Sequence, residues 1–132
     1  MFGSKTTGVY SFGDLAANFA GMKFWGELVG DKVATDKPYV KCVDDKWVKV
    51  REFDWLDWLD DSWDEGVNCN EYKNLKFKRS VNKTIKELEI KYPGSRFRCP
   101  VKNTCRKLVE KYGKDSAHLI HPDCLVDAVL YD

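Results

Sequence analysis

The spacing of apolar residues predicts a long helix near the start of the chain. Apolar side chains recur there at helical intervals: Leu15, Phe19, Met22, Trp25 and Leu28. Ser11 precedes this run and Asp14 follows it by three residues, close to the pattern of a capping box, and Gly30 suits the position after a helix end. We therefore expect a helix over residues 12–29. Its small residues would allow another element to approach closely: Ala16, Ala17, Ala20 and Gly21.

The next pattern is typical of strands. Two β-rich runs, residues 39–43 and 47–50, flank the short acidic sequence Asp44-Asp45-Lys46. Two such runs around a short turn predict a β-hairpin. Because a two-stranded hairpin is marginal by itself in water, we expect it to pack on the helices.

Residues 53–65 alternate aromatic and acidic side chains. Asp54 can act as an N-cap, and Leu56, Leu59 and Trp63 recur at helical spacing. Acids in the first turn also suit the helix dipole. The pattern predicts a helix over residues 55–66.

The apolar pattern in the second half of the chain predicts further helices. Asn70 can cap a longer helix that Pro93-Gly94 ends, with an apolar face formed by Phe77, Val81, Ile85, Leu88 and Tyr92. A short extended piece around Phe97 comes next. Two helical stretches then follow, one through Leu108, Val109 and Tyr112 that stops at Gly113, and one from Ser116 to near Leu130 that is interrupted at Pro122.

These elements indicate an α+β fold that is mainly helical, with about five helices and one small β-hairpin. At 132 residues the chain has the size of one domain, and its 43% of apolar residues suffices for a core. We expect a flexible N-terminal segment over residues 1–10 and a single globular domain over 11–132. No apolar run approaches the ~18 residues that a membrane-spanning helix needs.

The five cysteines are numerous for a reduced protein of this size and favour disulfide bonds. An odd count leaves one thiol unpaired and allows fifteen two-bridge patterns, three for each choice of the unpaired cysteine. The candidates are Cys42, Cys69, Cys99, Cys105 and Cys124. With Asn103 as a helix N-cap, a Cys99–Cys105 bridge is favoured, and Cys69 would pair with Cys42 or Cys124. Five buried thiols acting as small hydrophobes remain the alternative.

Disulfides also bear on the compartment. Residues 1–8 lack the charged and apolar regions of a secretion signal, which taken literally argues for the cytoplasm. The cysteines argue for an extracytoplasmic location, periplasmic or secreted. That location assumes that a leader or upstream region is missing from this sequence.

Charge is segregated along the chain. Residues 44–71 carry ten acids and three bases, and residues 73–114 carry fourteen bases and three acids. The two blocks can neutralise each other within the fold. Alternatively, the basic block faces an anionic partner through residues such as Lys76, Lys83, Arg96 and Arg98. Aromatic residues are few in this block, so nucleic acid is an unlikely partner.

The acidic block contains a second candidate surface. Trp55 and Trp58 lie among Asp57 and Asp61, and an exposed tryptophan beside carboxylates is what a glycan-binding platform needs. Core packing is the competing interpretation, because tryptophan is costly to leave in water. The same acids could form the carboxylate pair of a glycosidase, but nothing separates their environments.

A third cluster lies near the C-terminus. Cys99, Cys105, His118, His121 and Cys124 are ligand types that zinc prefers. The twelve residues between Cys105 and His118 match a zinc-finger interval, but the Cys–Cys and His–His spacings do not. A zinc site is therefore an alternative that competes with disulfides for the same sulfurs.

Together these features favour a non-enzymatic binding domain that acts outside the cytoplasm and needs no cofactor. Its partner would be a protein or glycan surface, which could be anionic. Two alternatives stay open. One is an intracellular zinc-stabilised nucleic-acid-binding module, and the other is a small secreted hydrolase that acts on glycan or cell wall.

Overall fold

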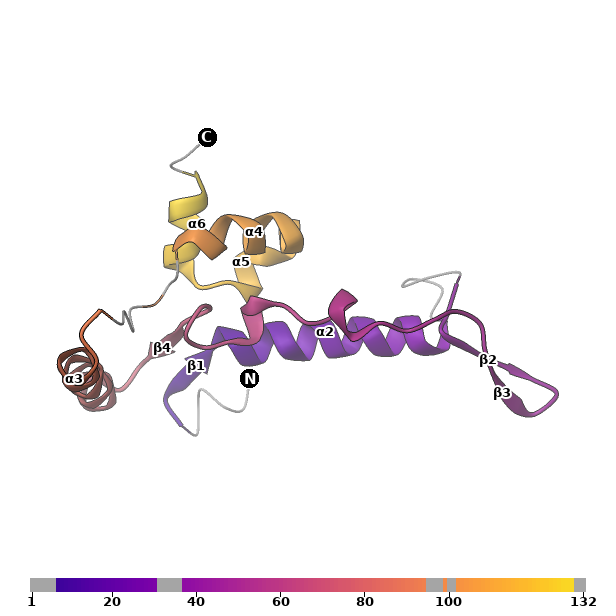
Figure 1. Ribbon diagram of the computed structural model, residues 1–132, viewed down its shortest axis with the longest axis horizontal. Coiled ribbons are helices and arrows are strands. Elements are labelled where there is room, and N and C mark those ends of the chain that lie inside the picture. The colour runs from indigo at the N-terminus through magenta and orange to yellow at the C-terminus, as the bar shows by residue number, and fades with distance from the viewer. Residues whose placement is uncertain (1–6, 31–36, 95–98, 100–101, 130–132) are drawn as a thin grey trace. The chain divides into compact units, whose positions relative to one another are not determined.

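The computed structural model of the protein describes residues 7–30, 37–94, 99 and 102–129 (Figure 1). These residues form five α-helices, four short strands and three 3₁₀ helices. In chain order they are β1 (Val9–Ser11), α2 (Phe12–Val29), β2 (Val40–Val43), β3 (Lys46–Lys49), η1 (Trp55–Asp57), η2 (Asp61–Trp63), β4 (Asn70–Tyr72), α3 (Leu75–Lys91), α4 (Lys102–Tyr112), η3 (Gly113–Asp115), α5 (Ser116–Leu119) and α6 (Pro122–Val129). None of the described helices combines the length and the apolar character that crossing a membrane requires.

The chain forms two compact units. Unit 1 comprises residues 1–16 and 61–132, and unit 2 comprises residues 17–60. The expected organisation, a flexible segment over 1–10 and a single domain over 11–132, stays a prediction. The mixed α+β, mainly helical character is confirmed.

A small antiparallel sheet in unit 1 was not predicted. β1 pairs with β4 so that Tyr10 lies opposite Glu71, and Ser11 lies opposite Asn70. The Lys73 N–H donates to the Gly8 carbonyl at 2.9 Å at the end of this ladder. Gly8 has a φ of +71°, a conformation that L-residues rarely adopt. The chain therefore turns into β1 at a position that favours glycine.

The helices α4, α5 and α6 form the core of unit 1. Their most deeply buried side chains are Cys105, Leu108, Leu119, Ile120 and Cys124. The Cys105–Cys124 disulfide joins α4 directly to α6, with the two Cα atoms 5.0 Å apart. Burial of apolar side chains and a covalent cross-link therefore act at the same place.

Asn68 fastens the loop before β4 to this core. Its side chain is fully buried, and its Nδ2 donates to the carbonyls of Ser62 at 3.0 Å and Leu119 at 2.9 Å. Its Oδ1 accepts from the His121 N–H at 3.0 Å. One amide side chain thus satisfies three backbone groups from separate segments, as buried polar groups require.

Unit 2 is organised around aromatic rings. A cluster of rings comes from its part of α2, from the residue before the hairpin and from the segment after the hairpin. Neighbouring centroids lie 4.8–6.5 Å apart: Phe24, Tyr39, Phe53, Trp55 and Trp58. The Trp58 indole N–H donates to the Tyr39 hydroxyl at 3.1 Å. The Arg51 guanidinium stacks 3.6 Å from the centre of the Tyr39 ring and also pairs with Glu27.

Several predicted elements are confirmed. The first helix spans Phe12–Val29, and the Ser11 hydroxyl accepts from the Asp14 N–H at 3.0 Å, as an N-cap does. The hairpin forms with Asp44 and Asp45 at its turn, where both residues have positive φ. The final helical stretch is interrupted before Pro122, as expected.

Two predictions in the middle of the chain are wrong. Residues 55–66 form two single 3₁₀ turns instead of a helix. The reason is local, because aspartate oxygens bond nearby backbone groups there: Asp54 accepts from the Leu56 N–H and Asp64 from the Gly66 N–H. The long helix is capped by Asn74, not Asn70, because Asn70 belongs to β4. The extended piece expected around Phe97 lies outside the described residues.

Candidate functional site

The helix α3 is the least buried helix of unit 1. Asn74 caps it, with its Oδ1 accepting from the N–H groups of Lys76 at 2.9 Å and Phe77 at 3.3 Å. None of its side chains is buried, and the half-exposed ones fall along a single stripe: Val81, Ile85, Leu88 and Glu89. The predicted apolar face is therefore present only in part, because Phe77 and Tyr92 at its two ends are exposed, and Val81 and Ile85 line an open space.

That space is a groove of about 940 Å³ in unit 1. One wall is formed by α3 and the other by β4, the Cys69–Cys99 disulfide and the beginning of α6. β4 and the residue after it contribute Asn70, Glu71, Tyr72 and Lys73. The helix α3 contributes Lys78, Val81, Asn82, Ile85, Lys86 and Glu89. A volume of this size falls within the ~300–1,000 Å³ that is usual for ligand sites.

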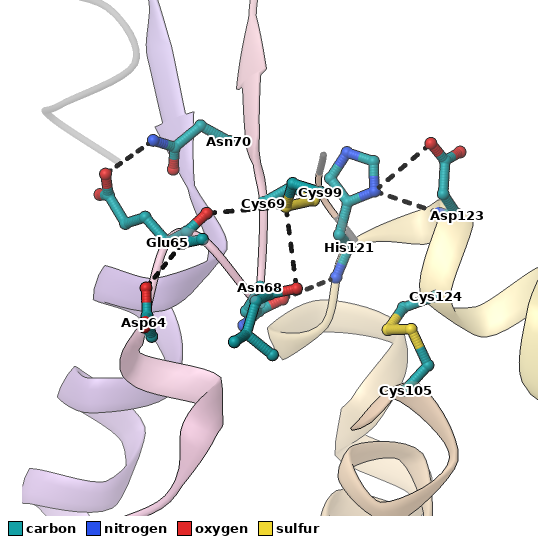
Figure 2. The surroundings of a disulfide bond; sticks show 12 residues. Asp64, Glu65, Asn68, Cys69, Asn70, Cys99, Cys105, His121, Asp123 and Cys124 are labelled. Atoms are coloured by element: carbon teal, nitrogen blue, oxygen red, sulfur yellow. Dashed lines mark hydrogen bonds and ion pairs between the residues drawn. A yellow bond between two sulfur atoms is a disulfide. The ribbon is translucent and has the colours of Figure 1, made fainter. Parts of the chain in front are cut away.

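The Cys69–Cys99 disulfide and His121 line the groove together (Figure 2). The Cys99 sulfur lies 3.6 Å from the Glu65 carbonyl oxygen. The His121 Nδ1 accepts from the Asp123 N–H at 3.2 Å, which leaves Nε2 as the protonated nitrogen of the neutral ring. An edge-to-face contact with Phe12, at 5.4 Å between ring centres, also orients the imidazole. His121 is thus positioned by contacts on two sides.

Glu65, one of the acids of residues 53–65, lines the same groove as His121. Both of its carboxylate oxygens are occupied. Oε1 accepts from the Ser11 hydroxyl at 2.7 Å and Oε2 from the Asn70 Nδ2 at 2.8 Å. Such contacts tie Glu65 to β1 and β4, and they give the carboxylate a structural role.

The sulfur pairing corrects the sequence-based interpretation. Cys69 pairs with Cys99, and Cys105 pairs with Cys124. The favoured Cys99–Cys105 bridge is wrong, as are both partners proposed for Cys69. The helix α4 already contains Asn103 and Cys105, so Cys105 lies on a helical turn whose buried face meets α6. Cys42 is the unpaired cysteine, and it is exposed on β2.

This pairing leaves the zinc alternative without its thiolates. Cys99, Cys105 and Cys124 are in disulfides, and His118 is exposed while His121 is half-buried. Among the residues that the structure describes, no three histidine, cysteine or acidic side chains are grouped as metal ligands would be.

The predicted basic surface falls on α3. Lys76 and Lys83 are exposed, and Lys83 lies 3.7 Å from Glu87 one turn along the helix. Other exposed bases on the same helix are Lys78, Arg79, Lys86 and Lys91. Arg96 and Arg98, which were expected to join this surface, lie outside the described residues.

The predicted Trp-rich acidic surface is only partly present. Trp55 is 61% exposed and Asp57 is exposed, but Trp58 is half-buried by its contact with Tyr39. Trp55, Asp57 and Trp58 belong to unit 2, whereas Asp61 belongs to unit 1. With no helix over 55–66, these four residues do not share one helical face.

An exposed apolar face on α2 was not predicted from the sequence. Met22, Trp25 and Val29 recur at i, i+3 and i+7 and therefore share one side of the helix. They are 68%, 64% and 39% exposed. The buried residues of this helix are Phe12, Gly13, Ala16 and Ala20, so its packed face consists mostly of small side chains.

Comparisons with protein-family models, with curated proteins and with solved structures find no match for this chain.

Proposed function

We propose that this protein is a non-enzymatic binding domain that recognises another protein outside the cytoplasm. The observation that carries the proposal is the exposed face of α2 formed by Met22, Trp25 and Val29. These three residues have the spacing of the anchors with which an amphipathic helix enters an apolar groove of a partner. The partner would therefore present such a groove.

The chemistry of these side chains supports a contact surface. Large apolar side chains that lie together on a surface often mark interaction sites, and tryptophan is among the residues that contribute most to binding energy. Methionine adapts to irregular partners because its side chain is long and unbranched. Except for Phe12, the buried positions of α2 carry small residues such as Ala16 and Ala20, whereas Met22, Trp25 and Val29 are exposed and accessible to a partner.

The two disulfides support the proposed location. Disulfide bonds form and persist in oxidising compartments, such as the periplasm or the outside of the cell, and are rare where glutathione keeps thiols reduced. Cys105 and Cys124 are 1% and 0% exposed, so reductants reach this bond only when the surrounding core opens.

The proposal is tested by comparing two variants of α2 as affinity baits. The first carries Met22→Ser, Trp25→Ser and Val29→Ser, and the matched control carries Asn18→Ser and Lys23→Ser, which replace exposed polar residues of the same helix. Each bait, with the wild type, is exposed to the extracellular or envelope fraction of the source cells. A partner that co-purifies with the wild type is then produced and titrated against all three proteins by calorimetry.

We expect the purified partner to bind the wild type and the control equally, and to bind the triple variant at least tenfold more weakly. Circular dichroism of the triple variant checks that α2 is retained. Equal affinity of the partner for the triple variant would refute a role for this face. A reaction product that forms on prolonged incubation with the partner would refute a purely binding role.

A further inference from the structure

We propose that α3 binds the surface of an anionic phospholipid membrane and lies there with its axis in the plane of the headgroups. The binding surface is the side of α3 that faces away from the groove, and it shares no residue with the α2 face. Between Leu75 and Lys91 the helix carries six bases and two acids. Its positive charge is therefore high for its length.

One face of α3 combines bases with exposed apolar side chains. At about 100° per residue, six residues of this helix fall within a sector of about 100°. They are Leu75, Lys76, Arg79, Lys83, Lys86 and Ile90. We call this sector the basic face of α3, and all of its residues are exposed. Val81 and Ile85 lie on roughly the opposite side of the helix and line the groove, and Lys86, near the margin of the basic face, lines it as well.

The charge of the basic face is not neutralised within the described part of the chain. Lys76, Arg79 and Lys86 have no ion-pair partner among the described residues. Lys83 lies 3.7 Å from Glu87, but both side chains are mostly exposed, and exposed pairs of this kind are weak. The acidic residues 44–71 therefore do not compensate these bases, and an uncompensated positive surface attracts an anionic partner.

The apolar side chains of the basic face indicate which anionic partner fits. Leu75 is 65% exposed in the first turn of α3 and Ile90 is 80% exposed in the last turn. They lie about 22 Å apart along the helix axis at 1.5 Å per residue, with the four bases between them. A sulfated polysaccharide or a nucleic acid would pair with the bases and leave both apolar side chains in water.

A membrane interface accommodates both kinds of side chain. Leucine and isoleucine can enter the boundary between headgroups and acyl chains, while lysine and arginine keep their charged ends at the level of the phosphates. Two apolar side chains and four bases are too few for a permanent anchor. We therefore expect reversible binding that weakens as the salt concentration rises.

The test is sedimentation of the full chain with sucrose-loaded vesicles of phosphatidylcholine, with and without about one-third phosphatidylglycerol. In about 0.1 M NaCl, we expect binding to the anionic vesicles to be at least tenfold stronger than binding to the neutral ones. Raising NaCl to about 1 M shortens the Debye length from about 10 Å to about 3 Å and should weaken the binding at least tenfold. The amides of α3 should exchange more slowly on anionic vesicles.

Two pairs of substitutions separate the basic face from the overall charge of the protein. Lys76→Gln with Arg79→Gln removes two charges from the basic face. Lys107→Gln with Lys114→Gln removes two charges from other exposed positions of unit 1. We expect the first pair to weaken vesicle binding at least fivefold and the second to weaken it less than twofold.

A third pair separates a membrane from a hydrophilic polyanion. Leu75→Ser with Ile90→Ser keeps every charge and should weaken vesicle binding at least fivefold, with the helix content checked by circular dichroism. Val126→Ser, at a position of α6 that is 59% exposed, is the control and should change binding less than twofold. Heparin provides the counter-probe, because its binding should respond to Lys76→Gln with Arg79→Gln but not to Leu75→Ser with Ile90→Ser.

Four results would overturn this inference. They are no binding to anionic vesicles in about 0.1 M NaCl, equal losses for the two pairs of charge substitutions, and vesicle binding that ignores the loss of Leu75 and Ile90. The fourth is loss of vesicle binding in the α2 variant with Met22→Ser, Trp25→Ser and Val29→Ser, which would assign the membrane contact to α2. The first three leave the α2 proposal unaffected, since that proposal is tested with a protein partner and other residues.

Discussion

Asn68 and His121 are joined by a hydrogen bond from the His121 N–H to the Asn68 Oδ1, at 3.0 Å. The same amide side chain donates to the carbonyls of Ser62 and Leu119. Asn68 therefore connects the loop before β4 to the start of α6 (Figure 2). In this way it also links the lining of the groove to the core that contains the Cys105–Cys124 disulfide.

The first prediction concerns this amide. Asn68→Ala should lower the free energy of unfolding by about 3 kcal/mol, because an unsatisfied buried polar group costs ~1–3 kcal/mol and three such groups would remain. Urea denaturation measures the loss. Asn82→Ala, at an exposed position of α3, is the control and should change stability by less than ~0.5 kcal/mol. Similar effects for the two variants would contradict the role given to Asn68.

The second prediction compares two glycines of α2. A Cβ at position 13 would lie 3.0 Å from the Trp63 carbonyl oxygen, whereas at Gly21 nothing lies within 4 Å. Gly13→Ala should destabilise the protein by about 1–3 kcal/mol through overpacking. Gly21→Ala should stabilise it by about 0.5–1 kcal/mol, because alanine is the better helix former. Thermal unfolding of both variants checks the opposite signs, and shifts in the same direction would count against the close approach of the Trp63 backbone to α2.

The third prediction concerns the sulfurs. Alkylation of the denatured protein without reductant should modify one cysteine, Cys42, and after reduction all five. Replacing Cys105 and Cys124 together by alanine should lower stability by about 3 kcal/mol, the value expected for a loop of this length. Cys42→Ser should have an effect below ~0.5 kcal/mol. Intact mass and peptide mapping would reveal any other pairing.

The fourth prediction concerns the independence of α3. Because no side chain of this helix is buried, its amides should exchange faster than those of α4, which holds Cys105 and Leu108 in the core. Asn74→Ala should remove about 1 kcal/mol of helix stability and so speed exchange in α3 about fivefold. Asn74→Asp keeps the accepting oxygen and should behave as the wild type. Hydrogen exchange followed by mass spectrometry resolves the two helices, and equal protection in them would contradict this picture.

Local patterns allowed much of the fold to be predicted from the sequence. The N-cap at Ser11, the hairpin turn at Asp44-Asp45 and the break before Pro122 each depend on residues close in the chain. Such signals act through neighbouring backbone groups, so they specify local structure largely independently of the rest of the fold.

Features that depend on distant residues were not predicted. The strands β1 and β4 have three residues each, too few for a periodic pattern. Their pairing joins Tyr10 to Glu71, which are separated in the chain by all of unit 2. The Cys105–Cys124 pairing follows from how α4 packs against α6, which no spacing rule specifies. The exposure of Met22, Trp25 and Val29 was not predicted, because their spacing is equally that of a helix face that packs in a core, and burial depends on which elements lie beside α2.

The same limit applies to the groove. Val81 and Ile85 were correctly placed on one face of a helix, but the sequence gives no sign that Asn70 to Lys73 form the opposite wall. That wall depends on β1 occupying the other edge of β4. A short polar strand such as Asn70–Tyr72 has no hydrophobic alternation to reveal it.

The Cys69–Cys99 bond has a consequence for proteolysis. It connects the residue just before β4 to a residue beyond α3. A protease that cuts the exposed helix α3 would therefore release no fragment, because the two pieces stay covalently attached. The nick would change the electrophoretic mobility of the denatured protein only slightly until a reducing agent separates the two pieces.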